Sequence, residues 1–180
     1  YISFAKLLLT YFKMKTPSYL FILIYLLIQS CTTSKQSSAD YFYKGNELAA
    51  VGNYSEAILH YSKAIAENPD YAEAYFNRGN AKKNNGDLKG SIDDYSQALV
   101  INPKYAAAYT NRGNAKNDVK DFHGALEDHN MAINIKPKDP NHYYNRGLTF
   151  YYLADYLKAY SDFTNAIDLN DTDFHFYNIR

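Results

Sequence analysis

Residues 72–105 read AEAYFNRGNAKKNNGDLKGSIDDYSQALVINPKY, and most of the chain repeats this stretch with a period of 34 residues. Glycine, a small residue, alanine and proline recur at fixed places in successive units: Gly45, Gly79, Gly113 and Gly147; Ala57, Ser91, Ala125 and Ala159; Ala64, Ala98, Ala132 and Ala166; Pro69, Pro103 and Pro137. A 34-residue period is typical of stacked helical hairpins. We therefore predict an all-α fold whose function lies in a binding surface rather than in a catalytic pocket.

Each unit carries the signals of two helices. The first half of unit 72–105 fits a helix of about fourteen residues, with Tyr75, Gly79 and Lys82 along one side. Gly86 suits a left-handed C-terminal stop, and Asp87 suits the N-cap of the second helix. The second helix is expected to bury a stripe formed by Ser91, Ile92, Tyr95, Ala98 and Leu99.

The recurring glycine stands inside the first helix of each unit. Glycine there costs about 1 kcal/mol relative to alanine. Its return at Gly45, Gly79, Gly113 and Gly147 predicts a close backbone approach between the paired helices, opposite the alanines.

This spacing of tyrosine, glycine, alanine, aromatic residue, alanine and proline resembles the tetratricopeptide repeat over most of the chain. The resemblance implies antiparallel helix pairs stacked into a right-handed superhelical solenoid with a concave groove. It predicts four complete repeats at residues 38–71, 72–105, 106–139 and 140–173, the last with Asp171 where proline is expected. Residues 174–180 are expected to begin a truncated fifth repeat, because Tyr177 and Arg180 fall one period after Tyr143 and Arg146.

In tetratricopeptide proteins the first helix of each hairpin lines the groove. The matching positions here are Phe42, Asn46, Ala49, Phe76, Asn77, Asn80, Lys83, Thr110, Asn111, Asn114, Asn117, Tyr144, Asn145, Leu148 and Tyr151. Because an amide both donates and accepts, a ladder of asparagines can pair with the backbone of an extended peptide, and aromatic rings can anchor its ends. The alternative is that these asparagines are solvated helix-face residues. Family members that clamp a terminal carboxylate use groove lysines and arginines; with only Lys83 here, that specificity is not expected.

A second pattern joins basic and acidic residues. Arginine recurs at one position and aspartate recurs sixteen residues later, whereas the first unit has Lys44 and His60 at these two places. The pairs are Arg78 with Asp94, Arg112 with Asp128, and Arg146 with Asp162. Their joint presence predicts a structural contact between packed helices rather than a ligand site.

Composition excludes several classes of function. The 180 residues carry no formal net charge, so there is no basic excess to attract nucleic acid. No nucleophile stands with a plausible base, and no phosphate loop or metal motif is present. The single cysteine, Cys31, excludes an internal disulfide framework, and His129 replaces an aromatic residue and is expected to pack as a ring. We expect no enzymatic activity, no cofactor, no metal and no nucleic-acid partner.

Residues 1–30 have the pattern of a targeting segment. They contain three lysines and no acidic residue, and the apolar run 19–28 is too short to span a membrane but suits an apolar helix at the core of a secretory signal. From Met14 onward the segment resembles a bacterial lipoprotein signal with the lipobox Ile28-Gln29-Ser30-Cys31, although glutamine is less typical there. The resemblance implies cleavage before Cys31, lipid on Cys31, and a flexible tether over residues 31–37.

Other interpretations of the chain ends remain open. Because the chain begins with tyrosine, residues 1–13 fit an upstream reading frame or part of a longer signal. An uncleaved transmembrane anchor over residues 2–28 is the alternative, although Lys6, Lys13, Lys15 and Pro17 interrupt it. We expect a non-enzymatic scaffold, lipid-anchored at the bacterial envelope (outer membrane or periplasm), that binds an extended peptide or partner protein. The alternatives are the recognition arm of a longer enzyme whose catalytic domain lies beyond Arg180, and an outer-membrane assembly or secretion accessory.

Overall fold

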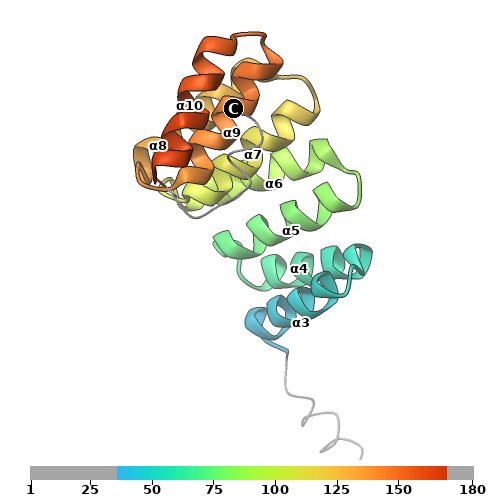
Figure 1. Cartoon of the computed structure of the whole chain (residues 1–180). Coiled ribbons are helices and arrows are strands. Elements are labelled where there is room, and N and C mark those ends of the chain that lie inside the picture. The colour runs from blue at the N-terminus through green and yellow to red at the C-terminus, as the bar shows by residue number, and fades with distance from the viewer. Residues whose placement is uncertain (1–35, 170–180) are drawn as a thin grey trace, which may run out of the picture. The chain divides into compact units, whose positions relative to one another are not determined.

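The computed structural model describes residues 36–169, which form eight α-helices and no strand (Figure 1). The helices are α3 (Ser38–Ala50), α4 (Tyr54–Glu67), α5 (Ala72–Asn84), α6 (Leu88–Ile101), α7 (Ala106–Asp118), α8 (Phe122–Ile135), α9 (Pro140–Tyr152) and α10 (Tyr156–Leu169). The all-helical expectation is confirmed for this range. The signal segment, its apolar helix, Cys31 and residues 174–180 lie outside the described residues, and of the expected tether only Gln36 and Ser37 lie within them.

The helices form a stack of hairpins. Helices α3 and α4, α5 and α6, α7 and α8, and α9 and α10 pack as pairs, and the second helix of each pair also packs on the first helix of the next. First helices of successive pairs touch as well, through α3 with α5, α5 with α7, and α7 with α9. Figure 1 shows this succession from α3 to α10. Every pair begins one period after the last, at residues 38, 72, 106 and 140.

The ends of the helices follow the capping residues. The side chains of Asn53, Asp87 and Asp121 each accept a hydrogen bond from a backbone N–H three residues later, which satisfies one of the unpaired donors of a helix start. The residue before each of these caps closes the first helix in the left-handed region. Gly52 and Gly86 do so with φ of 78° and 88°, and Lys120 and Ala154 take the same place in the last two repeats.

The recurring glycine is confirmed as a point of close approach, but its partner differs from the prediction. A Cβ on Gly79 would lie 2.7 Å from Cε1 of Tyr95, and one on Gly45 would lie 2.6 Å from Cε1 of Tyr61. His129 and Phe163 stand in the same relation to their glycines. The glycine therefore makes room for an aromatic ring of the second helix, which is the group nearest to it.

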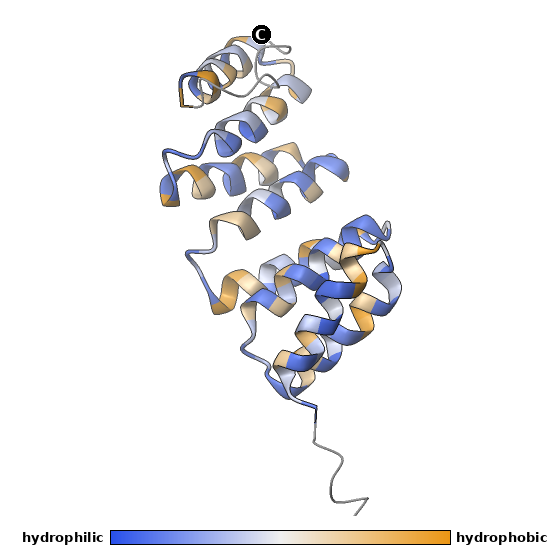
Figure 2. Cartoon of the chain, turned by 60° about the horizontal axis from the view of Figure 1, so that its bottom comes forward, coloured by the Kyte–Doolittle hydropathy of each residue, from blue (hydrophilic) through white to orange (hydrophobic). Residues whose placement is uncertain are grey.

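The core is thin and is shared between neighbouring helices. Alanines supply most of its buried apolar residues, including Ala57, Ala64, Ala74, Ala98, Ala108 and Ala132, all at 0% exposure. Apolar and polar residues accordingly alternate along the helices rather than gathering in one layer (Figure 2). In the predicted stripe of α6, Ser91 and Tyr95 are fully buried, whereas Ile92 is only half-buried. Repeats of this kind are stabilised mainly by their neighbours.

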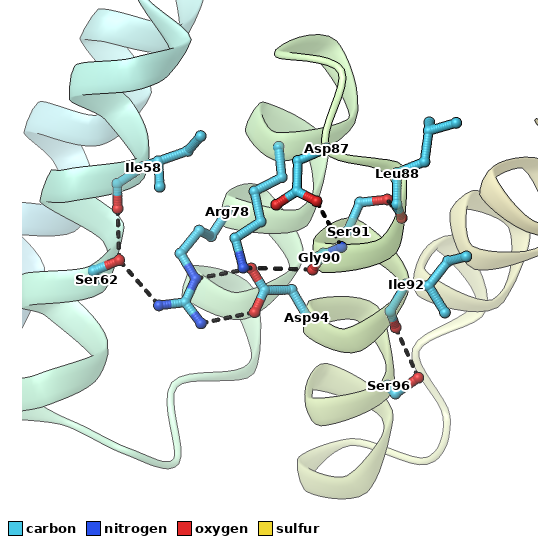
Figure 3. A network of polar contacts seen from close by, with 11 residues as sticks. Ile58, Ser62, Arg78, Asp87, Leu88, Gly90, Ser91, Ile92, Asp94 and Ser96 are labelled. Atoms are coloured by element: carbon cyan, nitrogen blue, oxygen red, sulfur yellow. Dashed lines mark hydrogen bonds and ion pairs between the residues drawn. The ribbon is translucent and has the colours of Figure 1, made fainter.

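The predicted arginine–aspartate contact is confirmed, and it extends into the preceding repeat. In Figure 3 the Arg78 side chain reaches from α5 toward both α6 and α4. Its Nε and Nη2 donate to the two carboxylate oxygens of Asp94 at 2.8 and 2.7 Å, and its Nη1 donates to Oγ of Ser62 at 3.0 Å. Lys82 also contacts Asp94, with Nζ 2.9 Å from Oδ2. Each bidentate pair therefore links three helices.

Candidate functional site

The asparagines on the first helices form a ladder across the first three repeats. Oδ1 of Asn46 accepts from Oη of Tyr61 and from Nδ2 of Asn77, both at 2.8 Å. One repeat later, Oδ1 of Asn80 accepts from Oη of Tyr95 and from Nδ2 of Asn111, again at 2.8 Å. The ladder thus joins α3, α5 and α7 through side-chain amides.

These bonds fix which way each amide faces. Burial raises the pKa of Tyr61 to about 12 and also raises that of Tyr95, so both hydroxyls keep their protons and act as donors at neutral pH. With their oxygens occupied, Asn46 and Asn80 keep Nδ2 donors that have no partner in residues 36–169. Asn77 and Asn111 use their Nδ2 groups within the ladder, so their side-chain carbonyl oxygens are left to accept hydrogen bonds from a ligand. The surface therefore presents donors and acceptors that recur once per repeat.

A pocket of about 310 Å³ opens beside the first half of this ladder. Its lining residues carry no charge and are Asn46, Ala49, Ala50, Tyr54, Tyr61, Asn77, Asn80, Ala81 and Asn84. Amides supply its polar atoms, and alanines and tyrosine rings supply its walls. Such a pocket suits an uncharged group, because a charge placed there would lose water without gaining an opposite charge.

Several predicted groove residues already pair with other residues of the protein, so their polar groups are not available to a ligand. Lys83, the single cation predicted there, pairs with Asp118 of the next repeat at 3.1 Å. Asn117 donates from Nδ2 to Oγ1 of Thr149 at 2.8 Å. Thr110 is only 8% exposed, and its Oγ1 donates to the Ala106 carbonyl. Thr110 therefore presents no polar group to a ligand, contrary to the prediction.

The predicted aromatic anchors of the first two repeats are part of the packing between hairpins. Phe42 lies between Tyr61 and Tyr71, with ring centroids 5.9 and 4.8 Å away. Phe76 repeats this arrangement with Tyr95 and Tyr105, at the same two distances. All of these phenylalanines and tyrosines are at least half-buried, so their main role is structural.

The ladder does not continue into the fourth repeat. Leu148 takes the place of the accepting asparagine, and Nδ2 of Asn145 donates to its own helix, at the Asn141 carbonyl, 2.6 Å away. Asn114 has no hydrogen-bond partner among the described residues. Tyr144 packs against Phe163 at 5.8 Å. Tyr151, by contrast, is 54% exposed and contacts Tyr156 edge to face at 5.6 Å.

Nothing in the described range gathers three metal-ligating side chains of histidine, cysteine, aspartate or glutamate. Within the same range, no helix combines the length and hydropathy needed to cross a bilayer.

Sequence comparison supports the type of repeat. A family model described as "TPR repeat" matches residues 45–86, and one described as "Tetratricopeptide repeat" matches residues 72–105. No curated protein sequence matches the chain. The periodic stretch predicted from the glycine and alanine spacing therefore contains tetratricopeptide repeats.

Solved structures with the same fold include other proteins of this type. MamA 41-end from Desulfovibrio magneticus RS-1 is 19% identical with a TM-score of 0.72, covering 78% of this chain and 79% of that one. A second MamA structure is 24% identical with a TM-score of 0.71, covering 76% and 74%. The first TPR of Spaghetti (RPAP3), bound to the HSP90 peptide SRMEEVD, is 24% identical with a TM-score of 0.64, covering 66% and 94%. At these identities the likeness establishes the fold alone.

Proposed function

We propose that this chain is a non-enzymatic interaction scaffold that binds an extended segment of a partner protein along the first helices of its repeats. The asparagine ladder carries the proposal, because Asn46 and Asn80 offer donors while Asn77 and Asn111 offer acceptors, one set per repeat. An extended peptide offers carbonyl and N–H groups at regular intervals, so it can pair with such a ladder whatever its side chains are.

The pocket beside Asn46 and Asn77 sets a preference on the peptide's side chains. Its walls are Ala49, Ala50 and Ala81, and no charged group lines it. We expect the side chain over this pocket to be small, apolar or amide-bearing. An acidic or basic side chain would lack a counter-ion there.

The binding test is a selection of peptides from a random library on the purified chain, followed by affinity measurement with fluorescence anisotropy. Asn80→Ala removes one free donor and the acceptor that orients Asn111. We expect it to weaken binding about fivefold, the equivalent of one hydrogen bond. Asn134→Ala is the matched control, because Asn134 is an exposed asparagine on α8 away from the ladder. Thermal melting checks that both variants stay folded.

Two outcomes would count against the ladder. One is equal affinity of Asn80→Ala and the unaltered chain for every selected peptide. The other is an equal loss with Asn134→Ala. A selected peptide methylated at its backbone nitrogens gives an independent measurement, since it should bind more weakly although its side chains are unchanged.

We also propose that the scaffold is held at a bacterial envelope by lipid on Cys31. The support comes from sequence: a basic start after Met14, an apolar run, and a small residue before the cysteine. Stable attachment needs more than one acyl chain. Metabolic labelling with a tagged fatty acid should label the unaltered chain and Ser30→Ala but not Cys31→Ser. Equal labelling of all three would rule the anchor out.

A further inference from the structure

The junction between the third and fourth repeats is built from different residue types than the two junctions before it. At the first junction Tyr61, Phe42 and Tyr71 form an aromatic triad, and Tyr95, Phe76 and Tyr105 repeat it at the second. The equivalent residues at the third junction are His129, Thr110 and Asp139. Three polar residues thus replace three aromatic rings.

A fourth substitution completes this polar cluster. His142 stands where the earlier repeats have the buried alanines Ala74 and Ala108, and it is only 4% exposed. Its Nδ1 lies 3.0 Å from Oγ1 of Thr110, and its Nε2 lies 3.7 Å from Oδ2 of Asp139. Because the Thr110 hydroxyl donates to the Ala106 carbonyl, Nδ1 is the donor to Thr110. Nε2 is therefore the nitrogen that takes up a proton.

His129 is the more confined of the two imidazoles. It is 0% exposed, and neither ring nitrogen has a hydrogen-bond partner among the described residues. At this position Tyr61 and Tyr95 donate to the ladder. A buried polar ring without partners is stable only while it is neutral.

The charged groups around His129 do not offset a proton. His142 and Arg146 on α9 and Lys116 on α7 all disfavour a positive charge there, and Asp128 on its own helix favours it. The Asp128 carboxylate already holds Arg112 at 2.6 Å and Lys116 at 2.9 Å. Around His142 the opposing pair is Asp139, which favours the charged form, and Lys136, which disfavours it.

We infer that the junction between the third and fourth repeats is an acid-responsive joint, in which protonation of His129 and His142 releases α9 and α10 while the aromatic junctions between the earlier repeats stay closed. Release would open His129 to water on the side where His142 and Arg146 now face it.

The direction of the pH effect follows from the titration of the buried rings. Burial lowers the pKa of His129 to about 4 from the ordinary 6.5, and it also lowers the pKa of His142. A histidine with a lowered pKa takes up its proton more readily in the open state. The closed state is therefore fully favoured above pH 6.5 and loses stability as the pH falls toward 4. From His129 alone, linkage gives about a 25-fold rise in the opening equilibrium between pH 7.5 and pH 5.

Hydrogen exchange of the full chain, corrected for intrinsic rates at pH 7.5 and pH 5.0, tests this joint. The opening equilibrium of α9 and α10 should rise about 25-fold, whereas that of α3 to α6 should change little. The double variant His129→Tyr with His142→Ala carries the residue types of the earlier junctions at these two positions. It should abolish most of the acid-dependent rise in the opening equilibrium. His123→Gln is the matched control, because His123 is an exposed histidine on the same helix.

Two results would overturn the inference. One is an equal acid response in α3 to α6 and in α9 and α10. The other is an unchanged response in the double variant. Should tyrosine fail to fit at position 129, His129→Phe supplies the residue type that the fourth repeat carries as Phe163, and it must also abolish the response.

Discussion

The first two repeats and the last two share one arrangement of helices but use their polar residues differently. In the first two, Tyr61 and Tyr95 orient accepting asparagines, and aromatic triads close the junctions. In the last two, His129 and Phe163 take the place of these tyrosines, and in the fourth repeat Leu148 replaces the accepting asparagine. The 34-residue period therefore preserves the fold, while the proposed peptide ladder lies in the first three repeats and the proposed acid-responsive joint lies between the third and the fourth.

The largest effect should come from the buried ion pairs, which also differ between the two halves. Arg146→Leu leaves Asp162 without a paired cation among residues 36–169, because Phe150 stands where Lys82 and Lys116 stand in the earlier repeats. Removing one partner of a buried pair costs about 3–5 kcal/mol. We expect Arg146→Leu near the upper value.

Arg112→Leu is the comparison for that variant. Here Asp128 keeps Lys116 at 2.9 Å, so the loss should lie nearer about 3 kcal/mol. Urea unfolding measures both. An Arg112→Leu chain that kept full stability and lost peptide binding would contradict the structural role of the pair.

A smaller effect should separate the turns of the two halves. Lys120 and Ala154 hold φ of 66° and 59°, where the first two repeats have glycine. Side chains are strained in this region, so Lys120→Gly and Ala154→Gly should each raise the free energy of unfolding by about 1 kcal/mol. Gly86→Ala should lower it by a similar amount. Thermal unfolding checks all three, and a loss with Lys120→Gly would show that its side chain makes a compensating contact.

The ladder itself should contribute less to stability. Tyr95→Phe removes the hydroxyl that donates to Asn80, and we expect a loss of about 0.7 kcal/mol together with weaker peptide binding. Phe163 already lacks this hydroxyl, so Phe163→Tyr should leave affinity unchanged because Leu148 offers no acceptor. Calorimetry measures stability and fluorescence anisotropy measures peptide affinity. If Tyr95→Phe and Phe163→Tyr changed affinity equally, the tyrosine hydroxyl would not distinguish the first two repeats from the last two.

The smallest effect should be at the predicted groove cation. Lys83 and Asp118 form a pair that is partly exposed on both sides, and such pairs contribute about 0.3 kcal/mol. Lys83→Ala should therefore leave both stability and peptide affinity nearly unchanged. A large drop in affinity would mean that Lys83 leaves Asp118 to contact the ligand.

Repetition made most of the fold predictable from sequence. Four glycines 34 residues apart located the hairpins, Asp87 located a helix start, and the joint occurrence of Arg78 and Asp94 identified a contact between helices. In each case the same residue type recurs at the same structural position, so a single sequence supplies several independent observations of each contact or helix end.

Contacts that depend on how one helix is rotated against the next were not predictable. The glycines were expected to face alanines, but they face the rings of Tyr61 and Tyr95. Thr110 occupies a groove position in the repeat yet turns into the junction with His142. One signal for the ladder was present: tyrosine follows the accepting asparagine by fifteen residues in the first two repeats and in neither of the last two.

The contact of Arg78 with Ser62 of the preceding repeat is part of a set of contacts that is the same at the first and second junctions between repeats. Arg112 makes the same contact with Ser96, and Asn111 donates to Asn80 just as Asn77 donates to Asn46. If residues 72–105 were excised, Arg112 would meet Ser62 and Asn111 would meet Asn46, with every donor still facing an acceptor. A lineage carrying this chain could therefore remove or duplicate the second hairpin without changing a side chain at the new junction.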